Sequence, residues 1–402
     1  MRIVCILGQH NYGDPSLGVS PEYRSFIPAL QKLGHEIIHI ESWDRSRFES
    51  FFELNRWIIQ TVLEKDPDLI FAVPFQHELW LETFDIISKT SRAKSICWST
   101  DDSWKYRECS RYLGKHFDLM LTTYASKIDH YRRDGIENIL LTQWGIAEDE
   151  LQTPIPANDC HYGVTFVGAA HGSRSKMVEY FKASGIPIEC FGNGWPRGSV
   201  SSTELRQIIR ESIVSLNFSN STGENQIKAR TFEVPGLGGC LLTQSASDLT
   251  QFLEVGRECE EFRNLPEAVR KCRELLANAS YRDQMAALGY ARVKANHTYE
   301  RRFSEIISRA DQLPSKHLQN VDTDRVLREF DRSYQNLPLN TIERAARKSL
   351  TTLCTLAWGQ RRGQRAARKI VYECCWRLQE ESTYSSQSIV GRWFYREPPK
   401  SN

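Results

Sequence analysis

Short apolar runs alternate with amphipathic helical patterns along most of the chain, and this alternation constrains the fold more than any other feature. Consecutive parallel strands need a crossover segment, usually a helix, so a repeated strand–helix pattern predicts βαβ units and parallel sheets. The sequence therefore predicts an α/β protein. Strands are expected at Ile3–Leu7, Glu36–Ile40, Leu69–Val73, Ser95–Ser99, Asp118–Thr123, Asn138–Gln143, Val164–Val167, Pro187–Phe191, Val214–Phe218 and Cys240–Thr243.

A break in this alternation predicts the domain boundary. Residues 148–161 are acidic, contain prolines and lack periodicity, as linkers do. The 402 residues also exceed what one α/β core usually holds. We expect two Rossmann-like, doubly wound domains over residues 1–150 and 151–312, with helices at 265–312 capping the second, and a helical tail over 313–402.

Composition narrows the class of protein. The first residues resemble a buried strand more than a signal peptide, and no apolar run is long enough to span a membrane. The eleven cysteines form no C-x-x-C pair, which favours reduced, structural thiols. We therefore expect a cytoplasmic protein.

The positive charge is concentrated in the tail. Residues 341–378 hold nine Lys/Arg and two acids, whereas the whole chain has a net charge of +2. The remainder is thus slightly acidic, which argues against a nucleic-acid partner. A basic helix that bears Trp358 and Trp376 predicts either contact with a membrane surface or a partner, or packing on the N-terminal domain.

The loop after the first strand, Gly8–Gly18, is one candidate for ligand binding, because open α/β sheets bind ligands beyond the carboxyl ends of their strands. Glycines such as Gly13 allow the backbone to approach a phosphate or a sugar. Their spacing matches neither the dinucleotide fingerprint nor the P-loop. The loop could also be an ordinary long turn.

Two adjacent carboxylates, Asp101 and Asp102, follow another predicted strand. Carboxylates in this position can bind sugar hydroxyls or act as a general base on an acceptor hydroxyl. A metal site is a further alternative. The alternative without a functional role is that Asp102 or Ser103 caps a helix.

The segment from Gln226 to Thr243 carries the most specific pattern. Lys228 and Arg230 can neutralise a diphosphate, and Glu233 can accept hydrogen bonds from ribose hydroxyls. Gly238 and Gly239 follow, directly before an apolar strand, and permit close backbone approach.

This segment resembles the donor-binding motif of glycosyltransferase families 1 and 4, and more closely that of the CgeB-like, spore-maturation-type enzymes. Six further stretches are similar, and the resemblance covers about residues 1–312. They are Asn11–Pro15, His35–Asp44, Phe166–Gly168 with Arg174, Phe191–Trp195, Leu216–Ser219 and His297–Arg302.

The resemblance implies a GT-B fold, in which two Rossmann-like domains face a cleft, and a nucleotide-sugar donor. It implies that Glu233 binds ribose and that Lys228 and Arg230 face the phosphates, with Lys228 contributing to catalysis. Gly168, Arg174, Gly194 and Trp195 would also lie at the donor. The chain departs from the E-x7-E motif of family 4, because Asn225 stands eight positions before Glu233, with Glu224 beside it.

The implied activity is transfer of a hexose-type sugar to a hydroxyl acceptor, a glycan or a lipid-linked glycan of the cell envelope. Cations would stabilise the leaving diphosphate, so neither a cofactor nor a metal is expected. Similarity to family 4 suggests retention of configuration, although the residues leave inversion open. A nucleotide-sugar epimerase and a non-catalytic assembly protein of the same fold are the alternatives.

Overall fold

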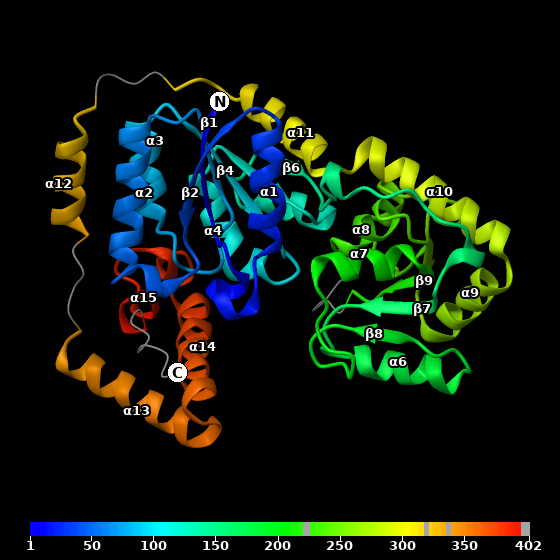
Figure 1. Cartoon of the computed structure of the whole chain (residues 1–402). Helices are drawn as coiled ribbons and strands as arrows, with labels where there is room; N and C mark the ends of the chain where they lie inside the picture. The colour runs from blue at the N-terminus through cyan, green and yellow to red at the C-terminus, as the bar shows by residue number, and fades with distance from the viewer. Residues whose placement is uncertain (220–225, 317–320, 335–338, 395–402) are drawn as a thin grey trace. The chain divides into compact units, whose positions relative to one another are not determined.

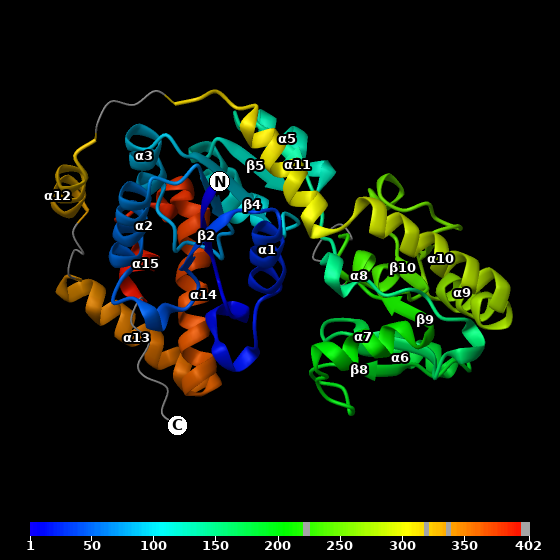
Figure 2. The same cartoon turned by 45° about the horizontal axis from the view of Figure 1, so that its top comes forward.

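The computed structural model describes residues 1–219, 226–316, 321–334 and 339–394. The chain forms two compact units, drawn in Figures 1 and 2. Unit 1 comprises Met1–Thr122, Ser126–Leu141 and Ile306–Asn402, and unit 2 comprises Thr123–Ala125 and Thr142–Glu305. Each unit contains one parallel sheet.

Unit 1 is built on six parallel strands in the order β2-β1-β3-β4-β5-β6. Helices α1 and α2 lie on opposite sides of this sheet (Figure 1), and α3 packs beside α2. The central strands are buried, because helices cover both faces of a parallel sheet. The elements are β1 (Arg2–Leu7), α1 (Pro21–Lys32), β2 (Glu36–Glu41), α2 (Phe51–Lys65), β3 (Leu69–Ala72), α3 (Leu81–Thr90), β4 (Lys94–Ser99), α4 (Arg111–Leu113), β5 (Leu119–Thr122), α5 (Ile128–Arg133) and β6 (Ile139–Leu141).

Unit 2 has a five-stranded parallel sheet in the order β11-β10-β9-β7-β8. Its edge strand β11 (Glu260–Phe262) was not predicted, because three residues with two acids carry no strand signal of their own. The two-domain α/β prediction is confirmed. The other elements are β7 (Tyr162–Val167), α6 (Arg174–Ala183), β8 (Glu189–Phe191), α7 (Ser202–Arg210), β9 (Ser212–Asn217), α8 (Arg230–Gly236), β10 (Leu241–Gln244), α9 (Leu265–Ala277) and α10 (Ala279–Asn296).

Helix α11 (Tyr299–Asp311) begins in unit 2 and ends in unit 1. Its last turns are held in unit 1, where Lys94 Nζ donates a hydrogen bond of 3.0 Å to the Asp311 carbonyl. The expectation that all helices over 265–312 cap the second domain is therefore wrong for α11. Its apolar residues Ile306 and Ala310 are buried within unit 1.

The C-terminal helices belong to unit 1. They are α12 (Thr323–Ser333), α13 (Thr341–Trp358), α14 (Gln360–Leu378) and α15 (Ile389–Trp393). Phe330 of α12 stacks on Phe52 with ring centroids 5.3 Å apart. From α14, Tyr372 and Trp376 join an apolar cluster with Leu113. Of the two alternatives for the basic tail, packing on the N-terminal domain therefore describes α12 and one face of α14.

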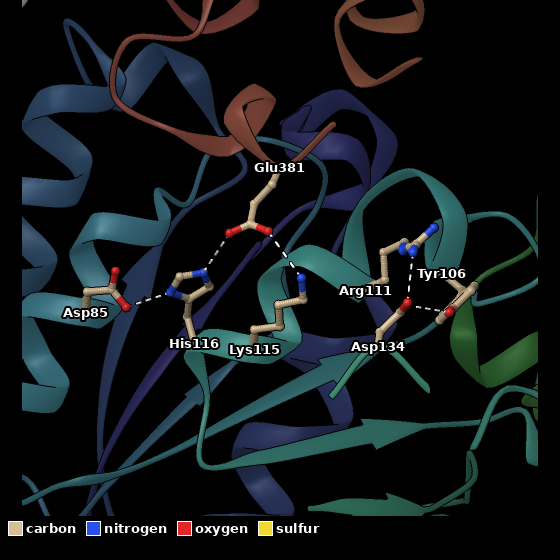
Figure 3. A network of polar contacts seen from close by, with 7 residues as sticks. All are labelled: Asp85, Tyr106, Arg111, Lys115, His116, Asp134 and Glu381. Atoms are coloured by element: carbon tan, nitrogen blue, oxygen red, sulfur yellow. Dashed lines mark hydrogen bonds and ion pairs between the residues drawn. The ribbon is translucent and has the colours of Figure 1, made fainter. Parts of the chain in front are cut away.

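Polar contacts strengthen this attachment. Glu381, which follows α14, accepts a hydrogen bond of 3.2 Å from Lys115 Nζ, and its carboxylate lies 3.7 Å from His116 Nε2 (Figure 3). The other ring nitrogen of His116 lies 2.6 Å from Asp85. The histidine thus links α3 to the tail.

Helix α13 presents an apolar face to solvent. Ile342, Leu353 and Leu356 have exposed fractions of 80%, 65% and 80%. They recur at the spacing of one helix face.

Helices α13 and α14 cross closely at Gly363 of α14, because a Cβ there would lie 2.4 Å from the Thr355 Cα. Within the described residues, no helix is both long and apolar enough to cross a bilayer.

The cysteines are free thiols, as expected. None is in a disulfide, and Cys5, Cys97, Cys190 and Cys240 are buried in or beside strands. Burial raises the pKa of Cys5, Cys190 and Cys240 to about 12, so these thiols stay protonated and behave as small apolar side chains.

His297 joins three segments of unit 2. Its Nε2 donates to the Phe252 carbonyl at 2.9 Å, and its Nδ1 accepts from Arg302 Nη2 at 2.7 Å. The second contact requires a neutral ring. Burial, reinforced by the positive charge of Arg302, lowers the pKa of His297 to about 4.

This depressed pKa makes the stability of unit 2 depend on pH. Between pH 6.5 and about 4 the unfolded chain binds a proton at residue 297 that the folded chain does not, so the free energy of unfolding falls as the pH is lowered. From pH 7 to pH 5 the loss due to His297 is about 2 kcal/mol. In His297→Gln, whose amide keeps a donor and an acceptor, urea unfolding at the two pH values should show a correspondingly smaller difference. The exposed His171→Gln serves as control, and an unchanged pH dependence in His297→Gln would contradict the assignment.

Candidate functional site

The candidate site lies at the carboxyl edge of the second sheet. Three neighbouring strands, β8, β7 and β9, end there, and the loops that follow carry polar side chains. Parallel pairing brings these strand ends together, which is why open α/β sheets bind ligands at this edge. Arg174, Trp195 and Arg230 each follow one of these strands.

Two arginines brace the ends of β7 and β9. Arg174, which follows β7, donates from Nη2 to the Phe218 carbonyl just after β9, at 2.8 Å. Arg230, which follows β9, donates from Nε to the Val167 carbonyl at the end of β7, at 3.3 Å. Each guanidinium therefore reaches across to the neighbouring strand, and the two positive charges lie near one another.

The surroundings of Arg174 disfavour its positive charge. Burial lowers its pKa, and the positive charge of Arg230 lowers it further. Its Nε is buried and has no hydrogen-bond partner within the described part of the chain. A buried donor without an acceptor costs about 1–3 kcal/mol, so an anion that supplied both charge and acceptor atoms would stabilise this site.

Trp195, in the loop after β8, packs against the end of β7. Its Nε1 donates to the Gly168 carbonyl at 2.7 Å, and its ring packs edge-on against Phe166. The loops after β7 and β8 approach closely, because a Cβ on Gly194 would lie 3.0 Å from the Ala170 Cβ. The φ of Gly194 is +87°, a conformation that favours glycine.

Lys228 and Glu233 flank Arg230. Glu233 forms a close ion pair with Arg230 one turn along α8, and both side chains are about four-fifths buried, with exposed fractions of 17% and 21%. Lys228 Nζ donates a hydrogen bond to the Gln226 side chain. The predicted donor residues Arg174, Lys228, Arg230 and Glu233 thus belong to one unit and follow adjacent strands.

Gly238 and Gly239 serve protein packing. A Cβ on Gly238 would lie 2.8 Å from Pro154, and one on Gly239 would lie 3.0 Å from Ile209. Both glycines are buried. The segments that approach these two glycines closely are therefore other parts of unit 2.

Gly13 also supports a close internal contact, in unit 1. Its φ is +67°, and a Cβ there would lie 2.1 Å from the Trp43 carbonyl oxygen. The loop at Gly8–Gly18 is therefore shaped by its packing against the residue that follows β2.

Asp101 and Asp102 have different environments at the end of β4. Asp101 is half-buried and accepts a hydrogen bond of 2.8 Å from Trp104 Nε1. Asp102 is fully buried and accepts hydrogen bonds from four hydroxyls, those of Ser99, Ser110, Thr122 and Tyr131. Burial raises its pKa, although the four hydrogen bonds act in the opposite direction. The carboxylate points into the fold, so the helix-capping alternative does not describe Asp102.

Asn217 was not singled out by sequence reasoning, although it positions the site. Its Nδ2 donates to Thr243 Oγ1 at 3.0 Å and lies 3.4 Å from Thr231 Oγ1, which ties β9 and β10 to the start of α8. An amide side chain at the carboxyl end of β9, in a strand whose other residues are apolar or serine, was the available signal. Glu224 and Asn225, the departure from the family 4 motif, lie outside the described residues. No cluster of three or more His, Cys, Asp or Glu suited to a metal occurs in the ranges described.

Part of the chain is similar to a known protein family. The sequence profile of a family described as glycosyl transferase-like matches residues 174–308, which is 135 of the 402 residues. This region begins at Arg174 and includes Trp195, Lys228, Arg230 and Glu233. No curated protein sequence matches the chain.

Solved structures share the fold at low sequence identity. Sucrose-phosphate synthase from Thermosynechococcus elongatus superposes with a TM-score of 0.57 at 11% identity, over 78% of this chain and 99% of its own. HepE from Anabaena, solved with UDP, has a TM-score of 0.55 at 11% identity, over 77% and 100%. A glycosyltransferase from Rickettsia africae has a TM-score of 0.54 at 12% identity, over 77% and 98%.

Residues 174–308 are therefore similar to a glycosyl transferase-like family, and the chain has a GT-B fold, so the resemblance inferred from the sequence is confirmed at that level. The CgeB-like subtype stays a prediction. These structures are covered almost completely, whereas about a fifth of this chain extends beyond each of them.

The two aspartates should respond differently to truncation. Asp102→Ala leaves four hydroxyls without their shared acceptor, so we expect the free energy of unfolding to fall by about 3–5 kcal/mol. Asp101→Ala removes the half-buried hydrogen bond from Trp104, and a loss of about 1 kcal/mol is expected. Urea denaturation monitored by circular dichroism measures both. Equal losses in the two variants would show that Asp102 is not the structural carboxylate described above.

Proposed function

We propose that the protein is a glycosyltransferase that moves a hexose-type sugar from a nucleotide-sugar donor to a hydroxyl of an acceptor glycan. The observation that carries this proposal is the pair of guanidiniums at the carboxyl edge of the second sheet, Arg174 and Arg230. The proposal draws further support from the family match over residues 174–308 and from the UDP and UDP-glucose bound to HepE.

A diphosphate complements this site in charge and in hydrogen-bond acceptors. The cluster contains three cations, Arg174, Lys228 and Arg230, and one carboxylate, Glu233. Phosphate oxygens accept several hydrogen bonds at once, and guanidiniums bind them through two parallel contacts. A bound diphosphate would neutralise the excess positive charge and give Arg174 Nε an acceptor. Glu233, held against Arg230, is the candidate for the ribose hydroxyls.

The same cations account for the chemistry that we propose. When the bond to the sugar breaks, negative charge develops on the leaving diphosphate, and preorganised cations stabilise it in the transition state. Lys228 and the two arginines would perform this role without a metal ion or a cofactor.

We further propose that the reaction retains the anomeric configuration. In this mode a donor phosphate oxygen takes the acceptor proton, so that no protein base is required. The environment of Asp102 is consistent with this, because its carboxylate is committed to four hydroxyls. The stereochemistry of the product, read by proton NMR of the anomeric signal, decides between retention and inversion.

A donor screen tests the proposal. Purified protein should bind one class of nucleotide sugar and hydrolyse it slowly in the presence of EDTA. Arg230→Ala and Lys228→Ala should each weaken donor binding roughly tenfold to a hundredfold, because a charge-assisted hydrogen bond contributes about 1.5–3 kcal/mol. Titration calorimetry and release of free nucleotide measure the two effects.

Arg206→Ala is the matched control, since Arg206 forms an ion pair with Glu150 elsewhere in unit 2. Absence of both binding and hydrolysis across a panel of nucleotide sugars would contradict the proposal and favour a non-catalytic assembly protein. Donor turnover without any acceptor that yields an epimerised nucleotide sugar would identify an epimerase instead.

We also propose that the tail brings the enzyme to the inner face of the membrane, where a lipid-linked or envelope glycan would be the acceptor. The exposed face of α13 carries Ile342, Leu353 and Leu356, and the same helix carries the exposed cations Arg344 and Lys348 on other faces. A helix with both an exposed apolar face and exposed cations suits an anionic bilayer surface.

Vesicle co-sedimentation tests this contact. The full chain should bind phosphatidylcholine vesicles that contain phosphatidylserine, and the double variant Leu353→Ser/Leu356→Ser should bind at least tenfold more weakly, because it loses buried apolar area. The control is Leu17→Ser, which changes an exposed leucine in the loop after β1. Equal sedimentation of all three proteins would rule out this face of α13 as a membrane contact.

A further inference from the structure

A basic hollow in unit 1 has no part in the donor site. It has a volume of about 470 Å³, and its walls come from the residues after β4, from α4 and from α5. Four cations line it, namely Arg107, Arg111, Lys127 and Arg133, together with His130. Volumes of this size hold small ligands.

The negative groups in the wall do not balance these cations. Asp134 is engaged by Arg111 at 2.8 Å and by the Tyr106 hydroxyl at 2.5 Å, as Figure 3 shows. Asp102, the other acid, is fully buried and turned toward four hydroxyls. Among the described residues, Arg107, Lys127 and Arg133 form no ion pair within 4.0 Å. These three cations therefore surround the hollow without an ion-pair partner in the described structure.

Structural roles account for only part of this set. The guanidinium of Arg107 lies over the ring of Trp376 at 5.1 Å, and that of Arg111 lies over Tyr112 at 5.4 Å. These contacts help to hold α4 and α14. Lys127 and Arg133 have no such ring contact in the described structure, and Arg133 donates only to the Asp129 carbonyl of its own helix, at 3.2 Å.

The location of the hollow relates it to the reaction. Asp102 and Ser103, which contribute to its wall, follow β4 at the carboxyl edge of the first sheet. Asp101, the accessible carboxylate, directly precedes them. A ligand anchored in the hollow would thus extend along the edge at which α/β sheets bind their substrates.

We propose that this hollow binds a phosphate group of the acceptor, so that the acceptor is a phosphorylated glycan or polyol. A phosphate ester carries up to two negative charges and several acceptor oxygens, which complements the unpaired Lys127, Arg133 and Arg107. The proposal rests on the proposed glycosyltransferase function, because it names the class of molecule that receives the sugar.

Phosphate binding can be measured without turnover. Titration calorimetry of the full chain with glycerol 3-phosphate, and with glycerol as the uncharged comparison, should show binding of the phosphorylated probe alone. Lys127→Ala/Arg133→Ala should weaken this binding at least tenfold, because it removes two charge-assisted contacts. Both side chains reach the surface, so circular dichroism and the unfolding midpoint should match those of the unmodified protein.

Two controls locate the bound probe. Arg132→Ala changes the neighbouring arginine of α5, which pairs with Asp129 at 3.2 Å and does not line the hollow, and it should bind as the unmodified protein does. Arg230→Ala disables the donor cluster of unit 2 and should leave the binding in unit 1 intact. Loss of binding in Arg230→Ala alone, or equal binding by Lys127→Ala/Arg133→Ala, would overturn the proposal.

The source of the phosphate is distinguished with vesicles. Phosphatidylcholine vesicles that contain phosphatidic acid present the same group as a lipid headgroup. Binding to these vesicles that is lost in Lys127→Ala/Arg133→Ala, with no binding of glycerol 3-phosphate, assigns a lipid phosphate. Absence of binding to both probes overturns the proposal. A failed donor screen with intact phosphate binding would instead count against the proposed function.

Discussion

Parallel strand pairing is the constraint on which the structure depends. In both units every strand runs in the same direction, so each strand must be followed by a segment that returns to the opposite edge. The loops that leave the carboxyl ends are consequently gathered along one edge, whereas the helices are used for covering the sheet. Arg174, Trp195 and Arg230 meet for this reason, although as many as 56 positions separate the first from the last. Their mutual bracing then fixes where the positive charge of unit 2 is concentrated.

The periodicity of the sequence was sufficient to predict the fold because helices and strands leave different apolar spacings. All ten predicted strands occur. The short edge strand β11 and the passage of α11 between units escaped prediction. The first has too few residues to show alternation, and the second depends on which core receives Ile306 and Ala310.

The site was predictable in its residue types and less so in their roles. Arg230 and Glu233 lie one turn apart on α8 and Lys228 lies two positions before it, so their association follows from local spacing. The distinction between Asp101 and Asp102 required knowledge of four hydroxyls, two of which lie 20 or more positions away. The basic hollow of unit 1 likewise draws on separate segments, and no motif connects Arg107 with Arg133. For Gly238 and Gly239 the sequence indicated a close approach of another group, but it did not identify that group as protein backbone or ligand.

The path of α11 has a consequence for how the protein is made. Unit 1 consists of residues on either side of unit 2 in the sequence, so unit 2 is in effect a domain inserted into unit 1. During synthesis the first sheet emerges early, yet Leu327 and Phe330, which complete its apolar cluster, emerge only after unit 2. Unit 2 has all its residues available before then and can fold as a unit on the ribosome. The first domain to be started is thus the last to be finished, and its uncovered apolar surface must be protected for the time that the ribosome needs to translate the intervening chain.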